Sequence, residues 1–253
     1  MSDELRRLLE DVAAGNLTTE EASARIAELP REAGAVAPGA EPVRRIVVRA
    51  GAVRLSIVAD PSVAEAVADG PHTMRREGDA LHISTNTTQG DYTVEPPRSM
   101  FMTWVGQMVN RVGAPVEILV NPDLPIQVLL VGGALDLRGV RAGASVGVEA
   151  GSALLSGSGP LLFDVASGSG KLDWTFTGQS RVRADMGSVN VTVRPDSDVV
   201  VTADTSLGQA VVKTHTGNLK APQDAATEPV VVGAGNGALS VSSRMGSAQV
   251  TIA

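Results

Sequence analysis

Short runs of alternating apolar and polar residues dominate the chain from Val43 onward. Between Ile46 and Val58, and again at Leu81–Ile83, apolar side chains recur at every second position. This is the period of a β-strand that buries one face. From Gly132 onward the runs become regular, and many of them begin with a glycine and a small residue. The pattern therefore predicts a mainly β protein.

The second half of the chain repeats itself with a period of nearly twenty residues. Four similar segments begin at Gly133, Gly151, Gly170 and Gly187, so the successive glycines are 18, 19 and 17 residues apart. Frequent turns would also suit a sandwich or a barrel, but self-similarity at a fixed period favours a solenoid whose coils stack on one another. We therefore expect a single-stranded-coil β-solenoid, similar to a β-helix, over 43–253.

Residues 1–29 show the different spacing of two short amphipathic helices. Gly15 ends the first helix, and Thr18 with Glu21 forms a capping box for the second. Helices this short are marginal alone, so their apolar faces need either the body of the protein or a second copy of the hairpin. The Ala-, Gly- and Pro-rich segment 30–42 is typical of a flexible linker and favours self-association. The expected oligomerisation residues are Leu5, Leu8, Leu9, Val12, Leu17, Ile26 and Leu29.

A segment of different composition interrupts the β pattern at about 96–115. It contains a tryptophan, a phenylalanine and three methionines, and prolines flank it on both sides. We favour a cap that covers the open end of the apolar core, and the alternative is a contact surface for a protein partner or a membrane. The candidate contact residues are Met100, Phe101, Met102, Trp104, Val105, Met108 and Val109.

Charge and composition narrow the function. The net charge of -7 argues against a general nucleic-acid binder, although Arg44, Arg45, Arg49 and Arg54 form a local basic cluster. Apolar residues alternate with these arginines, so we interpret the cluster as the solvated face of a strand. The absence of cysteine excludes disulfides, thiolate metal sites and cysteine nucleophiles. Neither a signal-peptide pattern nor an apolar run of 18 residues occurs, so we expect a cytoplasmic protein or one at the inner face of the cell membrane.

No motif in the chain predicts catalysis. The segment around Lys171 lacks the remaining residues of a phosphate loop. The segment 233–238 has the glycine spacing of a dinucleotide site, but a strand pattern follows it where that site needs a helix. The three histidines are far apart and show no zinc-binding spacing. When the repeats are aligned on their first glycines, Asp136 and Asp173 take the same place, with Asn190 next in register. Because paired carboxylates catalyse glycoside hydrolysis, a polysaccharide-active enzyme is a lesser alternative. We expect no enzyme activity, no catalytic residue, no cofactor and no metal.

The order of these features resembles a known family. The strands at 46–58, the segments at 77–83 and 116–125 and the glycine-spaced repeats are similar to the bacterial putative-adhesin, or Toastrack, β-solenoid family, over about 43–253. Residues 8–22 resemble the SHOCT-like bihelical oligomerisation element. This resemblance implies a non-catalytic interaction or scaffolding protein, in many relatives tied to cell-envelope stress systems and membrane-associated partners. The expected partners are the protein itself and a membrane-associated protein, with no nucleic acid.

An end-to-end polymer of the bactofilin kind is the main alternative. Residues 249–253 end the chain on an apolar strand without an obvious cap, and a last coil of that kind would leave its strand edge free to pair. Direct membrane contact through Phe101 and Trp104 is a further alternative, although the chain lacks the transmembrane segment of some relatives.

Overall fold

The computed structural model describes residues 42–85, 115–222 and 225–253. The chain divides into two compact units, Met1–Ala40 and Glu41–Ala253, and all described residues belong to the second. The predicted hairpin at 1–29, the linker at 30–42 apart from its last residue, and all candidate contact residues in 100–109 lie outside the described residues.

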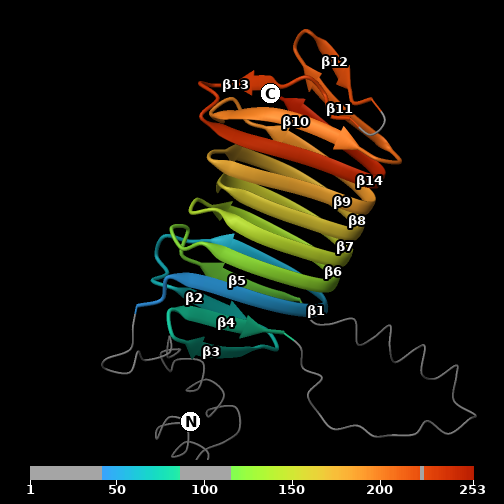
Figure 1. Cartoon of the computed structure of the whole chain (residues 1–253). Coiled ribbons are helices and arrows are strands. Elements are labelled where there is room, and N and C mark those ends of the chain that lie inside the picture. The colour runs from blue at the N-terminus through green and yellow to red at the C-terminus, as the bar shows by residue number, and fades with distance from the viewer. Residues whose placement is uncertain (1–41, 86–114, 223–224) are drawn as a thin grey trace, which may run out of the picture. The chain divides into compact units, whose positions relative to one another are not determined.

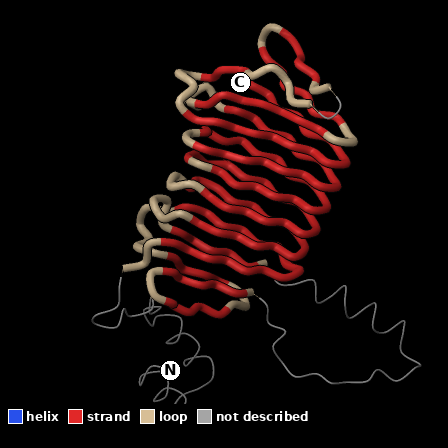
Figure 2. Tube along the Cα trace, viewed as in Figure 1, coloured by secondary structure: helices blue, strands red, loops and turns tan. Residues whose placement is uncertain are grey.

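The prediction of a mainly β protein is confirmed. The described residues form strands joined by turns, without a helix, and the strands belong to one 14-stranded sheet (Figures 1 and 2). The strands are β1 (Arg45–Ala59), β2 (Ala66–Asp69), β3 (Thr73–Glu77), β4 (Ala80–Ser84), β5 (Val116–Val120), β6 (Ile126–Val140), β7 (Ala144–Gly159), β8 (Leu161–Phe176), β9 (Gln179–Val193), β10 (Val199–Thr205), β11 (Gln209–Thr214), β12 (Gly217–Lys220), β13 (Val230–Val232) and β14 (Gly237–Ile252).

The long strands are bent, and each returns close to where it began. β6 pairs with β7 in parallel, with Ile126 opposite Ala144, yet only residues 141–143 connect the two strands. A straight strand of this length would span about 50 Å, which so short a connection cannot cover. β6 must therefore fold back on itself. β7, β8 and β9 follow the same rule, so each long strand has a first arm, a bend and a second arm (Figure 2).

Glycines form the bend, and their register corrects one predicted repeat position. Gly151 pairs with Gly168, and Gly168 pairs with Gly187, so the third bend glycine is Gly168. The expected glycine, Gly170, lies two residues later and is buried in the core. A Cβ atom there would lie 2.6 Å from Cε1 of Phe163, so Gly170 leaves room for that ring. The Ser-Gly-Ser-Gly sequence at 167–170 offers two glycines, and only packing distinguishes them.

The core lies between the two arms, and it is filled by columns of residues in register. Large and small side chains compensate for one another across neighbouring strands. Trp174 is fully buried against Gly157, where a Cβ atom would lie 2.8 Å from the indole ring. The indole Nε1 donates a hydrogen bond to the carbonyl oxygen of Gly159 at 2.9 Å, so this buried polar group is satisfied. One such column consists of Ile83, Val48, Val128, Val146, Phe163, Val182, Val241 and Ala203.

Both ends of the stack are covered by short strands. β14 lies between β9 and the layer formed by β10 and β11, so the expectation of an uncapped C-terminal strand is wrong. In the same way, β1 lies between β6 and the layer formed by β4 and β5. Outside these layers, β3 pairs antiparallel with β4 and β2 with β5 at one end, and β13 pairs antiparallel with β10 and β12 with β11 at the other (Figure 1). The chain thus closes its stack with strands from its interior.

The bend leaves no room for side chains. A Cβ atom at Gly151 would lie 2.2 Å from the carbonyl oxygen of Gly133, and one at Gly168 would lie 1.9 Å from that of Gly151. Gly187 and Gly246 continue this glycine ladder into β9 and β14, with corresponding distances of 2.1 and 1.9 Å. The obstacle in each case is backbone, which cannot move aside without separating two paired strands.

We predict that Gly168→Ala destabilises the protein by about 3 kcal/mol or more, because the new methyl group meets the backbone of the next layer. Gly78→Ala is the matched control. Gly78 also has positive φ, at 58°, but a Cβ atom there meets nothing within 4 Å. Its cost should be limited to the backbone term of about 1 kcal/mol. Denaturant unfolding followed by circular dichroism measures both, and equal losses would contradict the ladder argument.

Candidate binding trough

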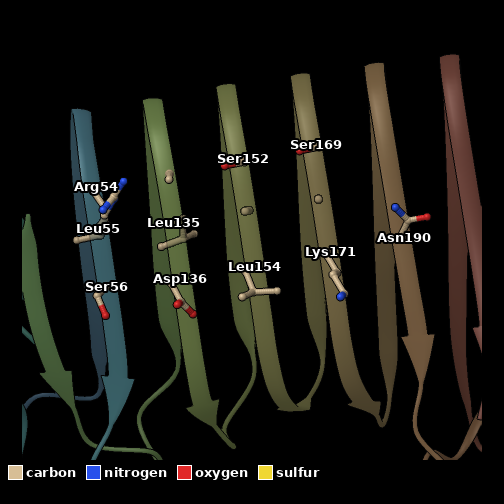
Figure 3. Close-up of a pocket in the computed structure, with 13 residues that line it drawn as sticks. Arg54, Leu55, Ser56, Leu135, Asp136, Ser152, Leu154, Ser169, Lys171 and Asn190 are labelled. Carbon is tan, nitrogen blue, oxygen red and sulfur yellow. The ribbon is translucent and has the colours of Figure 1, made fainter. Parts of the chain in front are cut away.

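A shallow trough of about 550 Å³ runs across β1, β6, β7, β8 and β9 on the outward side of their second arms (Figure 3). Two rows of outward side chains form it. The first row follows the bend glycines, and the second row lies two residues further along each strand. The first row contains Arg54, Ala134, Ser152 and Ser169, and the second contains Ser56, Asp136, Leu154, Lys171 and Asn190.

The difference in size between the two rows creates the hollow. After Arg54, the first row contains only alanine and serine, which rise little above the sheet. The second row carries the longer side chains of Asp136, Leu154 and Lys171, which lie in one line in Figure 3. Because strands in a sheet are about 4.8 Å apart, each row presents one side chain at that interval. The trough is therefore a regular, narrow surface with Arg54 on its first strand, β1.

Arginines neutralise the carboxylates in and beside the trough. Nε of Arg138 donates to Oδ1 of Asp136 at 2.7 Å, and a second bond joins its Nη2 to Oδ2. Asp173 lies outside the trough, two residues after Lys171 on β8, and accepts two hydrogen bonds of 2.8 Å from Arg194. These bonds lower the pKa of Asp173 against a smaller opposing effect of burial, and the charges of Arg194 and Lys171 lower it further. Both carboxylates are thus engaged with cations.

Two cations of the trough are not used in this way. Within the described ranges, Arg54 and Lys171 form no ion pair shorter than 4 Å, and both side chains are exposed. They lie on β1 and β8, which are three strand spacings apart through β6 and β7. The trough therefore offers two separated positive charges, and Ala134, Asp136, Ser152 and Leu154 lie on the two strands between them.

Asp136 and Asp173 do not occupy the same place in the repeat, which corrects the sequence alignment. Asp136 aligns with Leu154 and Lys171, whereas Asp173 aligns with Ser156 and Thr192. The error follows from choosing Gly170 instead of Gly168 as the third bend glycine. The polar column predicted from these two carboxylates does not form. A general acid in glycoside hydrolysis needs a raised pKa, and the pKa of Asp173 is lowered.

The basic cluster of the sequence is exposed, as predicted, but the fold divides it. Arg49 lies on the first arm of β1, and Arg54 lies on the second arm beyond the bend. Arg45 forms an ion pair of 3.5 Å with Asp79. Only Arg54 reaches the trough.

In the ranges that the structure describes, no group of three His, Asp or Glu side chains could hold a metal ion. The same ranges contain no helix long and apolar enough to cross a membrane.

Sequence reasoning noted several trough residues separately but did not assemble them. Arg54 belonged to the basic cluster, Lys171 to a rejected phosphate loop, and Asp136 to a catalytic alternative. The signal that joins them is the distance from the bend glycine. Aligned on the observed bend, Ser152 and Ser169 are one residue after it, and Leu154 and Lys171 are three residues after it.

The fold is similar to that of one solved structure, at low sequence identity. No protein-family model matches the chain, and no curated protein is similar to it. The crystal structure of a putative cell adhesion protein from Clostridium sporogenes has a TM-score of 0.43 and 12% sequence identity. The match covers 83% of this chain and 94% of that one.

We predict that the Asp173–Arg194 pair stabilises the fold above about pH 4, the ordinary pKa of aspartate, and that this contribution disappears as pH falls through the lowered pKa of Asp173. The two side chains are 46% and 41% exposed, so the contribution should not exceed about 1 kcal/mol. Arg194→Gln should therefore lose stability at neutral pH and approach the parent protein once the pH is below the lowered pKa of Asp173. Urea unfolding across this range measures the difference. Arg181→Gln, which removes an exposed arginine of the first arm, should show no such convergence.

Proposed function

We propose that this protein is a non-catalytic interaction or scaffolding protein built on a β-solenoid, in which each bent long strand is one coil. The trough is the observation that carries the proposal. It is formed by side chains from five neighbouring strands, so its shape depends on the register of the whole stack rather than on one loop. Such a surface suits the binding of an extended partner.

The stack is well suited to present this surface without changing shape. β6, β7, β8 and β9 each have a hydrogen-bonded neighbour on both sides. Their inward side chains are packed and buried, including Phe163, Trp174 and Phe176. A densely packed interior of this kind resists deformation. The protein would therefore act by holding groups at fixed spacing.

Self-association is the second part of the proposal. The amphipathic pattern at 1–29 gathers several copies through its apolar positions, and the linker at 30–42 lets the gathered β units reach one extended partner. Linking weak sites raises their effective concentration, so modest affinity in each trough becomes high avidity. Cell-envelope stress response is the setting that the Toastrack resemblance implies for such a scaffold.

The end-to-end polymer alternative was based on a free C-terminal strand, and the structure shows that this strand is paired on both sides. The edge strands β2, β3, β12 and β13 are three to five residues long, and they replace the free C-terminal strand that the alternative required. Arg75 and Glu77 on β3 and Lys220 on β12 are exposed. Short, charged edge strands are a common protection against edge-to-edge pairing. We therefore favour gathering through 1–29 over stacking of the β units.

We predict that Leu8→Asp combined with Ile26→Asp reduces the mass in solution to that of the 26.0 kDa monomer, because each charge interrupts an apolar stripe. Multi-angle light scattering over a range of concentrations measures the mass. Arg7→Gln combined with Arg25→Gln is the matched control, since it changes neighbouring polar positions of the same segments. An intact protein that is already monomeric, or a mass unchanged by the aspartates, would refute gathering through 1–29.

A second observation separates the two modes of assembly. Negative-stain microscopy of the aspartate variant should show no filaments, and its far-UV circular dichroism should remain that of the parent. Filaments that persist in this variant would instead support a polymer built from the ends of the β units.

A further inference from the structure

We infer that the trough binds an anionic glycan chain, which lies along the stack and crosses the strands. This inference rests on the proposed interaction function and specifies its partner. The chemical class is an acidic polysaccharide, with sugar hydroxyl groups along its length and carboxylate or phosphate groups at intervals.

The length and repeat of the trough suit a linear sugar chain. The trough crosses five strands, and therefore extends about 19 Å at the usual strand spacing of about 4.8 Å. A pyranose unit in an extended glycan has a similar length, so successive units can meet equivalent side chains on successive strands. The serine row continues past the trough, because Ser188 and Ser247 follow Ser169 in register on β9 and β14.

The neutral side chains of the trough match a sugar surface. Ser152 and Ser169 are exposed hydroxyl groups that can donate and accept, and the Asn190 amide can do both as well. Leu154 lies between Asp136 and Lys171 in the longer row and is 40% exposed. It offers an apolar contact to the C–H face of a ring. Hydroxyl and amide groups beside a small apolar platform provide the two kinds of contact that a sugar needs.

The charges of the trough require an anionic ligand. Arg54 and Lys171 are three strand spacings apart across the sheet and two residues apart along the strands, so their Cα atoms are separated by about 16 Å. Asp136 is held by Arg138, and Asp173 outside the trough by Arg194, so neither needs a cation from a ligand. These two cations, which form no ion pair within 4 Å in the described residues, would be complemented by acidic groups about three sugar units apart. Both cations belong to a chain whose net charge is -7.

An acidic peptide fits the trough less well. Extended peptides commonly bind by adding a strand to an open sheet edge, where main-chain hydrogen bonds supply the affinity. All five strands under the trough are paired on both sides, so no such edge is available there. The two rows also leave no deep pocket for a peptide side chain. Sequence-tolerant nucleic-acid binding usually needs aromatic platforms, and the trough has none among its lining residues.

Calorimetric titration of the full-length protein with defined oligomers tests the inference. Oligogalacturonates should bind with an affinity that rises from dimer to tetramer and changes little from tetramer to hexamer, because a tetramer already spans Arg54 to Lys171. Maltohexaose, which lacks carboxylates, should bind at least about tenfold more weakly. Affinity for the hexagalacturonate should fall as sodium chloride is raised, since salt screens exposed charges.

Variants locate the binding to the trough. Arg54→Gln and Lys171→Gln should each weaken hexagalacturonate binding about tenfold, whereas Lys171→Arg should retain most of it. Arg181→Gln is the matched control, because it removes another exposed cation, from the outward side of the other arm. Unchanged melting temperatures would show that the losses do not arise from unfolding.

Three results would overturn the inference. Hexagalacturonate binding that is insensitive to both trough variants would place the site elsewhere. Tighter binding of a hexaglutamate peptide would identify the ligand as an acidic peptide. A protein that self-associates in light scattering but binds none of these oligomers would refute the glycan ligand while leaving the proposed scaffold intact, so the two failures can be told apart.

Discussion

The close approach of backbone to backbone at the bend is the constraint on which the β unit depends. Gly133, Gly151, Gly168 and Gly187 stack so closely that a methyl group at any of them would meet the carbonyl oxygen of the preceding layer. This contact lets a strand of 15 or 16 residues reverse within a few residues while its two arms keep their hydrogen bonds. Two facing arms then enclose the core, and their outward sides carry every row of surface side chains. The trough depends on the bend, because its two rows lie at the same distances after the bend in each strand.

The sequence was sufficient for the coarse architecture and for the alternating faces of the strands. Ile46, Val48, Leu55 and Ile57 are buried as their period indicates, and the arginines between them are exposed. This succeeded because burial on alternate positions is a local property. The choice between Gly168 and Gly170 was not local. It depended on the Phe163 ring, which needs the space at Gly170, and a shift of two residues keeps the same face and so leaves no trace in the period.

Neither the order of the layers nor the trough could be predicted from the sequence, because neither is a local property of the chain. Both depend on pairing between segments far apart in the chain, such as β1 with β6 and β9 with β14. An apolar strand at the C-terminus looks like an open end, since nothing local shows that β10 and β11 cover it. Arg54 and Lys171 share a surface only because β6 and β7 lie between their strands. The glycine spacing was compatible with the observed register, but only the packing distinguishes Gly168 from Gly170 as the bend glycine.

The interior position of β14 has a consequence for the order in which the protein can be made. During synthesis, β10 and β11 leave the ribosome before β14, yet their parallel neighbour in the finished sheet is β14. Until that last strand arrives, β9 exposes a full-length edge, and the layer of β10 and β11 has no site on which to dock. The nascent chain therefore passes through a stage in which its longest unpaired edge is open to other chains. β14 completes the sheet from within, and the layer of β10 and β11 can close over it only after β14 has been synthesised.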